Sequence, residues 1–115
     1  ALLMDETVQQ TGEECMVVVA GGRVIALTKN MPERYDYAGE GVGFLRVRHA
    51  DTPHVVSSLR GYIDRGSWDM EYEDALRPYF QDVRVGYERI GGLPWTEIDF
   101  IEDVRKAELE VLPKL

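Results

Sequence analysis

The chain is poor in cysteine and has no long apolar run, and each absence excludes a class of protein. Its 115 residues include a single cysteine, which rules out an internal disulfide and favours a cytosolic address. Its apolar stretches, such as Met16–Ala20, fall far short of the ~20 residues of a membrane-spanning helix. Because residues 1–5 carry no cationic region, we expect no secretory leader and a cytoplasmic protein.

Basic residues are also scarce. Thirteen Lys and Arg stand against 21 Asp and Glu, which gives a formal net charge of −8. Binding to nucleic acid or to an anionic membrane surface depends on clustered Lys and Arg, so we expect neither kind of partner. A phosphate-handling enzyme remains compatible with this balance if a divalent cation mediates the contact.

The first half of the chain predicts β-structure. Apolar, β-branched runs at 15–20 and 23–28 flank Gly21-Gly22, the signal of a two-residue β-hairpin turn. We expect a lead-in loop over the first dozen residues and a loop over 29–40. A strand is expected over 42–48, where glycines indicate close approach of the backbone to a neighbour or a ligand.

The second half predicts alternating helices and strands. Asp51-Thr52-Pro53 is a helix start and Gly66 a helix end, and a second apolar stripe runs from Tyr72 to Phe80. Strands are expected at 83–87 and 95–99, followed by a last helix that ends at Pro113. The fold class is therefore α/β: a mixed β-sheet flanked by helices, with a β-hairpin.

Asp99 is the leading candidate for a functional residue. It lies at the expected C-terminal tip of the 95–99 strand, the edge of an open α/β sheet where ligands and metal ions bind. Mg²⁺ takes one or two carboxylates together with substrate phosphates. The alternative is that Asp99 is the N-cap of the following helix, and the local pattern leaves both readings open.

Three blocks of sequence carry a resemblance to a known family. They are Gly39–Phe44, Trp68–Leu76 and Trp95–Val104, the last with its Trp-Thr-Glu-Ile-Asp motif before Glu-Asp. From Gly39 to Leu112 the chain resembles the C-terminal half of sugar-phosphate and alcohol-phosphate nucleotidyltransferases, above all cytidylyltransferases acting on phosphocholine, inositol phosphate or aminophosphonates.

The resemblance implies a fold, a reaction and a set of residues. Residues 1–115 would be the C-terminal, acceptor- and metal-binding half of a Rossmann-like domain. The enzyme would transfer a nucleoside monophosphate, CMP from CTP, to a phosphorylated alcohol or sugar and release pyrophosphate. Asp99 would bind Mg²⁺, and no side chain would act as nucleophile. The resemblance places Glu73 and Asp74 near the acceptor. The other residues expected at the substrate are Glu40, Trp68, Trp95 and Glu97.

The chain departs from the family pattern in two places. Phe100-Ile101 stands where relatives place Thr-Pro, and no glycine-rich phosphate loop is present, because Gly21-Gly22 lies in a hairpin and Gly39–Gly43 leads into a strand. The nucleotide would therefore be bound by a missing N-terminal half or by another chain, including a second copy. We expect the chain alone to be inactive.

Several of these residues also have a structural interpretation. Glu73 and Asp74 suit the first turn of a helix, where acids complement the helix dipole. Trp68 and Trp95 suit core packing as well as contact with a quaternary ammonium. The alternative function is a non-catalytic interaction module that self-associates through exposed strand edges.

Overall fold

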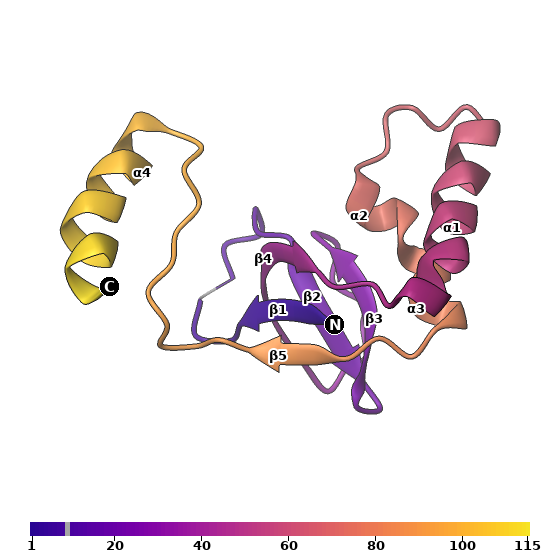
Figure 1. Ribbon diagram of the computed structural model, residues 1–115, viewed down its shortest axis with the longest axis horizontal. Coiled ribbons are helices and arrows are strands. Elements are labelled where there is room, and N and C mark those ends of the chain that lie inside the picture. The colour runs from indigo at the N-terminus through magenta and orange to yellow at the C-terminus, as the bar shows by residue number, and fades with distance from the viewer. Residues whose placement is uncertain (9) are drawn as a thin grey trace.

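The computed structural model describes residues 1–8 and 10–115 and shows a mixed α/β fold built on one sheet (Figure 1). Its five strands lie in the order β3-β2-β4-β1-β5. Strands β1 and β5 are parallel and the other neighbours antiparallel, so the expected mixed sheet is confirmed. The strands are β1 (Leu2–Asp5), β2 (Met16–Ala20), β3 (Arg23–Thr28), β4 (Tyr37–Leu45) and β5 (Tyr87–Arg89).

The predicted hairpin is confirmed as the pair β2 and β3. Gly21 and Gly22 have φ angles of +59° and +69°, the two positive values that a type I′ turn requires. This turn matches the right-handed twist of the strands, so the two glycines fix the register of the pair. All three valines of β2 are fully buried, which places this strand in the interior of the protein.

Strand β4 lies between β2 and β1 and begins earlier than the sequence predicts. Its first residue is Tyr37, so Glu40 lies within a strand and not in a loop. A Cβ added at Gly39 would lie 2.8 Å from the backbone oxygen of Asp5, and one at Gly41 would lie 3.1 Å from that of Cys15. The glycines thus allow close approach of neighbouring strands, one of the two alternatives that the sequence left open.

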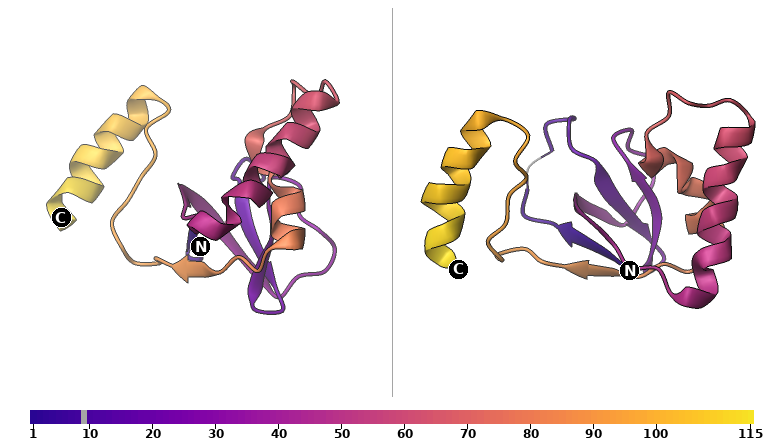
Figure 2. Two further views of the ribbon diagram at one scale, coloured as in Figure 1. Left: turned by 45° about the vertical axis from the view of Figure 1, so that its right-hand side comes forward. Right: turned by 45° about the horizontal axis from the view of Figure 1, so that its top comes forward.

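Three helices cover the sheet beside β3: α1 (Thr52–Asp64), α2 (Tyr72–Ala75) and α3 (Arg77–Asp82), as Figures 1 and 2 show. Their buried side chains continue the apolar stripe predicted for this region, although Tyr72 itself is exposed. Together with the strands they form the core: Leu2, Met4, Val17, Val19, Val24, Leu27, Leu76, Tyr79, Phe80, Val83 and Val85.

One buried hydroxyl joins these helices. Ser58 of α1 donates to the carbonyl oxygen of Ala75 at 2.6 Å and accepts from the backbone N–H of Tyr79 at 3.3 Å. Both backbone groups are thereby satisfied in an apolar setting. The start of α1 is preceded by a short 3₁₀ turn, η1 (His49–Asp51), where the carboxylate of Asp51 binds Arg48 at 2.6 Å and does not cap the helix.

Two expectations from the sequence are wrong, one at the N-terminus and one before the last helix. Residues 2–5 form strand β1, held between β4 and β5, where a lead-in loop was expected. Residues 95–99 form no strand, and Glu97, Ile98 and Asp99 are exposed. Partners distant in the chain decide both cases: β1 is short but paired on both sides, whereas 95–99 has no neighbouring strand to bind.

The expected strand at 83–87 is displaced, although its inward and outward alternation is confirmed. Val83 and Val85 are buried and Arg84 is exposed, but the regular strand β5 begins only at Tyr87. Val85 accepts a hydrogen bond from Val24 of β3 at 2.9 Å, and Gly86 accepts one from Leu2 of β1 at 3.0 Å. Two consecutive residues thus accept hydrogen bonds from β3, at one edge of the sheet, and from β1, near the other edge. The segment before β5 therefore bridges the two edges at this end.

The chain ends in a helical segment that lies apart from the sheet (Figures 1 and 2). It runs through α4 (Ile101–Lys106), the π-type turn η2 (Ala107–Val111) and the 3₁₀ turn η3 (Leu112–Lys114). Most of its apolar side chains are exposed, including Ile101 at 72% and Leu109 at 75%. Among the helices that the structure describes, none combines the length and the apolar character needed to cross a membrane.

The close contact at Gly39 predicts opposite effects for two glycine-to-alanine changes. Gly39→Ala is expected to lower the free energy of unfolding by about 1–3 kcal/mol, because the new methyl displaces the β1 backbone. A Cβ at Gly61, inside α1, meets nothing within 4 Å, so Gly61→Ala is expected to stabilise by about 0.4–1 kcal/mol. Urea unfolding curves measure both, and an unchanged stability of Gly39→Ala contradicts the assigned strand contact.

Candidate functional site

Two adjoining cavities lie between the sheet and the segments that follow it. The larger, of about 600 Å³, we call the acidic cleft; the smaller, of about 410 Å³, we call the helical cleft because α4, η2 and η3 line one wall. Three residues belong to both cavities: Glu40, Glu97 and Asp99. Each volume is in the range of small-molecule sites.

The acidic cleft collects carboxylates from segments distant in the sequence. They come from the chain before β2, from β4, from α2 and from the loop before α4. Among the described residues that line it, Lys29 is the one cation. The carboxylates are Glu13, Glu14, Glu40, Glu71, Glu73, Glu97 and Asp99. A cavity with this lining favours a cationic ligand over an anionic one.

Glu40 shows the electrostatic consequence of this crowding. Its pKa is raised above the ordinary value of 4.5, first by burial and then by the negative charges of Glu97, Glu14 and Asp5. The ionised form of Glu40 is therefore disfavoured in the folded protein. A cation bound among these carboxylates reduces the repulsion between them, so the charge of the cleft favours binding of a cation.

Two other side chains of the cleft feel the same field. Burial, and after it the charges of Glu73 and Glu71, raise the pKa of the Cys15 thiol to about 12. Burial and the charge of Glu73 raise the pKa of Tyr72 as well. At neutral pH Cys15 is thus a protonated thiol and not a nucleophile.

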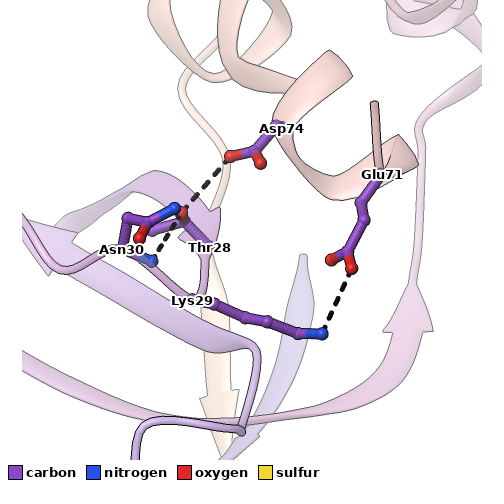
Figure 3. Close-up of polar contacts among 5 residues, drawn as sticks. All are labelled: Thr28, Lys29, Asn30, Glu71 and Asp74. Atoms are coloured by element: carbon purple, nitrogen blue, oxygen red, sulfur yellow. Dashed lines mark hydrogen bonds and ion pairs between the residues drawn. The ribbon is translucent and has the colours of Figure 1, made fainter. Parts of the chain in front are cut away.

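The lysine of the cleft is already paired (Figure 3). Lys29 Nζ lies 3.2 Å from Glu71 Oε1, and this contact raises the pKa of Lys29. Beside it, Thr28 Oγ1 donates to Asp74 Oδ1 at 3.2 Å and accepts from the backbone N–H of Asn30 at 3.1 Å. These contacts tie α2 to the end of β3. In the part of the cleft lining that the structure describes, the other carboxylates have no cationic partner.

Asp99 does not cap the last helix. The N-cap position is Phe100, and the backbone N–H groups of Asp99 and Phe100 both donate to Asp103 Oδ2, at 3.1 and 2.9 Å. The same bonds lower the pKa of Asp103. Within residues 1–8 and 10–115, the Asp99 carboxylate accepts no hydrogen bond, and Asp99 is exposed beside both cavities. The capping reading left open by the sequence is therefore wrong.

The donor chemistry at Asp99 suits Mg²⁺, but the residues described do not complete a site. A free carboxylate is a hard oxygen ligand, and Mg²⁺ accepts one such ligand when phosphates supply others. No group of three or more His, Cys, Asp or Glu in the described chain is arranged to hold a metal ion. Asp99 thus fits as a single ligand and not as part of a preformed cage.

The structure separates the candidates named from the sequence. Glu40, Glu73 and Glu97 line the acidic cleft together with Asp99, and Trp95 lines the helical cleft. Asp74 and Trp68 line neither. Asp74 holds α2 to Thr28, and Trp68, at 75% exposure, stands in the connection between α1 and α2.

Several residues of the cleft were not among the sequence candidates. Glu14 and Glu71 contribute charge, and Asp5, at the end of β1, lines the helical cleft and bonds Trp95. A signal existed for Asp5, because an acidic residue directly follows the apolar run 1–4. None existed for Glu14 or Glu71, whose positions depend on how β2 and α2 fold together.

Comparisons with protein-family models, curated proteins and solved structures found no match for this chain. The family resemblance therefore depends on the three sequence blocks alone.

The crowding at Glu40 predicts that removing its charge stabilises the protein. Since its folded pKa is raised, the stability contributed by the protonated form is complete below pH 4.5 and is lost as the pH rises through the folded pKa. Glu40→Gln, which imitates the protonated form, is expected to melt at a higher temperature at pH 7 and at the wild-type temperature below pH 4.

Glu88→Gln, on β5 outside the acidic cleft, is the matched control and removes the same formal charge. Thermal melts monitored by circular dichroism over pH 3.5–8 give the comparison. A lower melting temperature of Glu40→Gln at pH 7, or a gain as large in Glu88→Gln, contradicts the assigned repulsion.

Proposed function

We propose that the chain is the acceptor-binding half of a Rossmann-like nucleotidyltransferase that moves a nucleoside monophosphate, CMP from CTP, to a phosphorylated alcohol or sugar. One observation supports this above the others. Glu40, Glu73 and Glu97, which the sequence predicts at the substrate, come from β4, α2 and the 90–100 loop and line one cleft beside Asp99. Residues so far apart in sequence meet only through the fold.

The cleft favours an acceptor with a cationic group. Its volume of about 600 Å³ accommodates a small phosphorylated alcohol, and its carboxylates attract a cation. Tyr72, exposed at 58%, adds an aromatic face, the kind of surface that binds quaternary ammonium groups. Phosphocholine combines such a group with a phosphate, so it is the acceptor that we expect to bind best.

The residues of this chain act by positioning and charge. Glu73 and Glu97 would hold the cationic end of the acceptor, which leaves its phosphate oxygen free to attack the α-phosphorus in line as pyrophosphate departs. Asp99 would hold Mg²⁺ together with phosphate oxygens, and the bound ion would neutralise charge that develops on the α-phosphate. No side-chain nucleophile takes part, in keeping with the protonated thiol of Cys15.

The nucleotide requires residues beyond those of the cleft. Gly21-Gly22 forms a hairpin turn and Gly39–Gly43 lies in β4, so neither group of glycines precedes a helix that would bind phosphate. In the proposal, a separate nucleotide-binding half supplies the glycine-rich loop and a second carboxylate for the metal.

A second candidate function is self-association as a non-catalytic module, and the C-terminal segment favours it. Phe100, Ile101, Leu109 and Leu112 are exposed at 60–75%, more apolar surface than a lone helix normally presents to water. Sedimentation equilibrium separates the two candidates. A monomer over the whole concentration range removes self-association, whereas a tight dimer without acceptor binding supports it.

The proposed reaction predicts which changes reduce activity. In the complete product of the gene, pyrophosphate release from CTP and phosphocholine with Mg²⁺ is expected to fall at least about tenfold in Glu73→Gln and Glu97→Gln. Each change removes a charged contact worth roughly 1.5–3 kcal/mol. Glu88→Gln is the control and is expected to retain the wild-type rate.

Two results would contradict the proposal. One is the absence of pyrophosphate release with every nucleoside triphosphate and every phosphorylated alcohol or sugar tried. The other is full activity of residues 1–115 alone, because this chain would then bind the nucleotide without a glycine-rich loop.

A further inference from the structure

The carboxylate of Asp5 is buried at the C-terminal end of β1 and fully engaged. Asp5 is only 6% exposed. Its Oδ1 accepts from the backbone N–H of Thr7 at 2.9 Å and from Thr7 Oγ1 at 2.6 Å, while its Oδ2 accepts from Trp95 Nε1 at 2.7 Å. A short bond between an indole N–H and a carboxylate is a charge-assisted contact and stronger than a neutral one.

This bond holds a loop that has little other support. Residues 90–100 contain no strand, and in 91–100 only Pro94, Trp95 and Thr96 are half-buried while the rest are exposed. Among the residues that the structure describes, the Trp95–Asp5 bond is the one hydrogen bond that ties 94–98 to the sheet. The flanks are fixed elsewhere, by Gly91 to Glu6 at 3.3 Å and by Asp103 at the helix start.

The residues directly after Trp95 include two that line both cavities. Glu97 and Asp99 follow it by two and four positions, and both are exposed. Trp95 itself lines the helical cleft with Asp5 and Glu40. The hydrogen bond between Trp95 and Asp5 therefore determines the positions of Glu97 and Asp99 relative to Glu40.

We propose that Asp5 is a positioning residue: through Trp95 it fastens the 94–99 loop to β1, so that Glu97 and Asp99 face the acidic cleft. The catalytic consequence depends on the proposed function, whereas the fastening itself does not. Asp5 acts through the indole and touches no substrate. Loss of the bond leaves Thr7 to satisfy Asp5 and frees the loop without removing core side chains.

The fastening is tested first without any substrate. The two tryptophans give two indole N–H signals in a ¹H–¹⁵N spectrum, and Trp68, at 75% exposure, is the internal reference. The Trp95 signal is expected to exchange with solvent at least about tenfold more slowly than that of Trp68. In Asp5→Asn the ratio is expected to fall towards one. Equal exchange of the two indoles in the wild-type protein overturns the proposal.

Two variants guard against simple unfolding. Asp5→Glu keeps the carboxylate on a longer side chain, and its indole exchange is compared with that of Asp5→Asn. Trp95→Phe retains an aromatic ring but removes the pyrrole part of the indole with its N–H, so this variant is used only in the activity measurement. Each variant is examined only where circular dichroism shows the wild-type fold. Recovery of slow Trp95 exchange in Asp5→Glu above that in Asp5→Asn supports the carboxylate as the acceptor, and equal fast exchange in both overturns it.

The catalytic consequence is measured in the complete gene product. Trp95→Phe and Asp5→Asn are expected to lower kcat for pyrophosphate release about 100-fold, since a displacement near 1 Å suffices for such a loss. The KM for CTP is expected to change much less than kcat, because in the proposal the glycine-rich loop that binds the nucleotide belongs to the other half of the enzyme. Wild-type kcat in both variants overturns the positioning role and leaves the proposed function standing. No activity in any protein, with Trp95 still protected, rejects the proposed function and leaves the fastening intact.

Discussion

The close approach of β1, β4 and β2 around Gly39 and Gly41 is the constraint on which the rest of this structure depends. A Cβ at Gly39 would lie too close to the backbone of Asp5 for the strands to keep their positions, and one at Gly41 would crowd the backbone oxygen of Cys15. Between the two glycines stands Glu40, paired with Asp5 on one side and Met16 on the other. The carboxylate of Glu40 is thereby held on a central strand, whose backbone is paired on both sides.

Glu40 lies among other negative charges, which the positive charge of Lys106 offsets only in part. Among the residues that the structure describes, its neighbours across the cleft are further carboxylates, and the one lysine in the lining is paired with Glu71. Burial and negative charge together raise the pKa of Glu40. Groups with perturbed pKa values are common at functional sites, because a bound ligand of opposite charge can reduce the repulsion that shifts the pKa. The acidic cleft has this character, and a cation is the ligand that relieves it.

Much of the fold follows from local sequence signals. Gly21-Gly22 defines the β2–β3 hairpin, Thr52-Pro53 begins α1, and the stripe ending at Phe80 marks the helices that cover the sheet. In each case the information lies within a few residues of the element. Strand β1 could not be predicted in this way, since its four residues become a strand only through pairing with β4 and β5.

The site was predictable to the extent that motifs carry chemistry. Glu40, Glu73, Glu97 and Asp99 were named from their sequence blocks, and the fold brings all four to one cleft. The pattern at 95–99 nevertheless predicted a strand, because aromatic and β-branched residues are typical of strands. The same residues can also lie in a loop that a single hydrogen bond holds in place, and the sequence does not distinguish the two cases. The actual support is Trp95 on Asp5, a contact across 90 positions. Sequence patterns do not show such contacts.

The most direct test of this account is a titration of residues 1–115 with phosphocholine in the presence of Mg²⁺, followed by NMR. The account predicts chemical-shift changes at the backbone amides of Glu40, Tyr72 and Glu73, larger than those caused by glycerol 3-phosphate, which lacks the cation. The changes should weaken in Glu40→Gln. Equal responses to both phosphates, or shifts confined to the C-terminal helix, would show that the acidic cleft is not a site for a cationic acceptor.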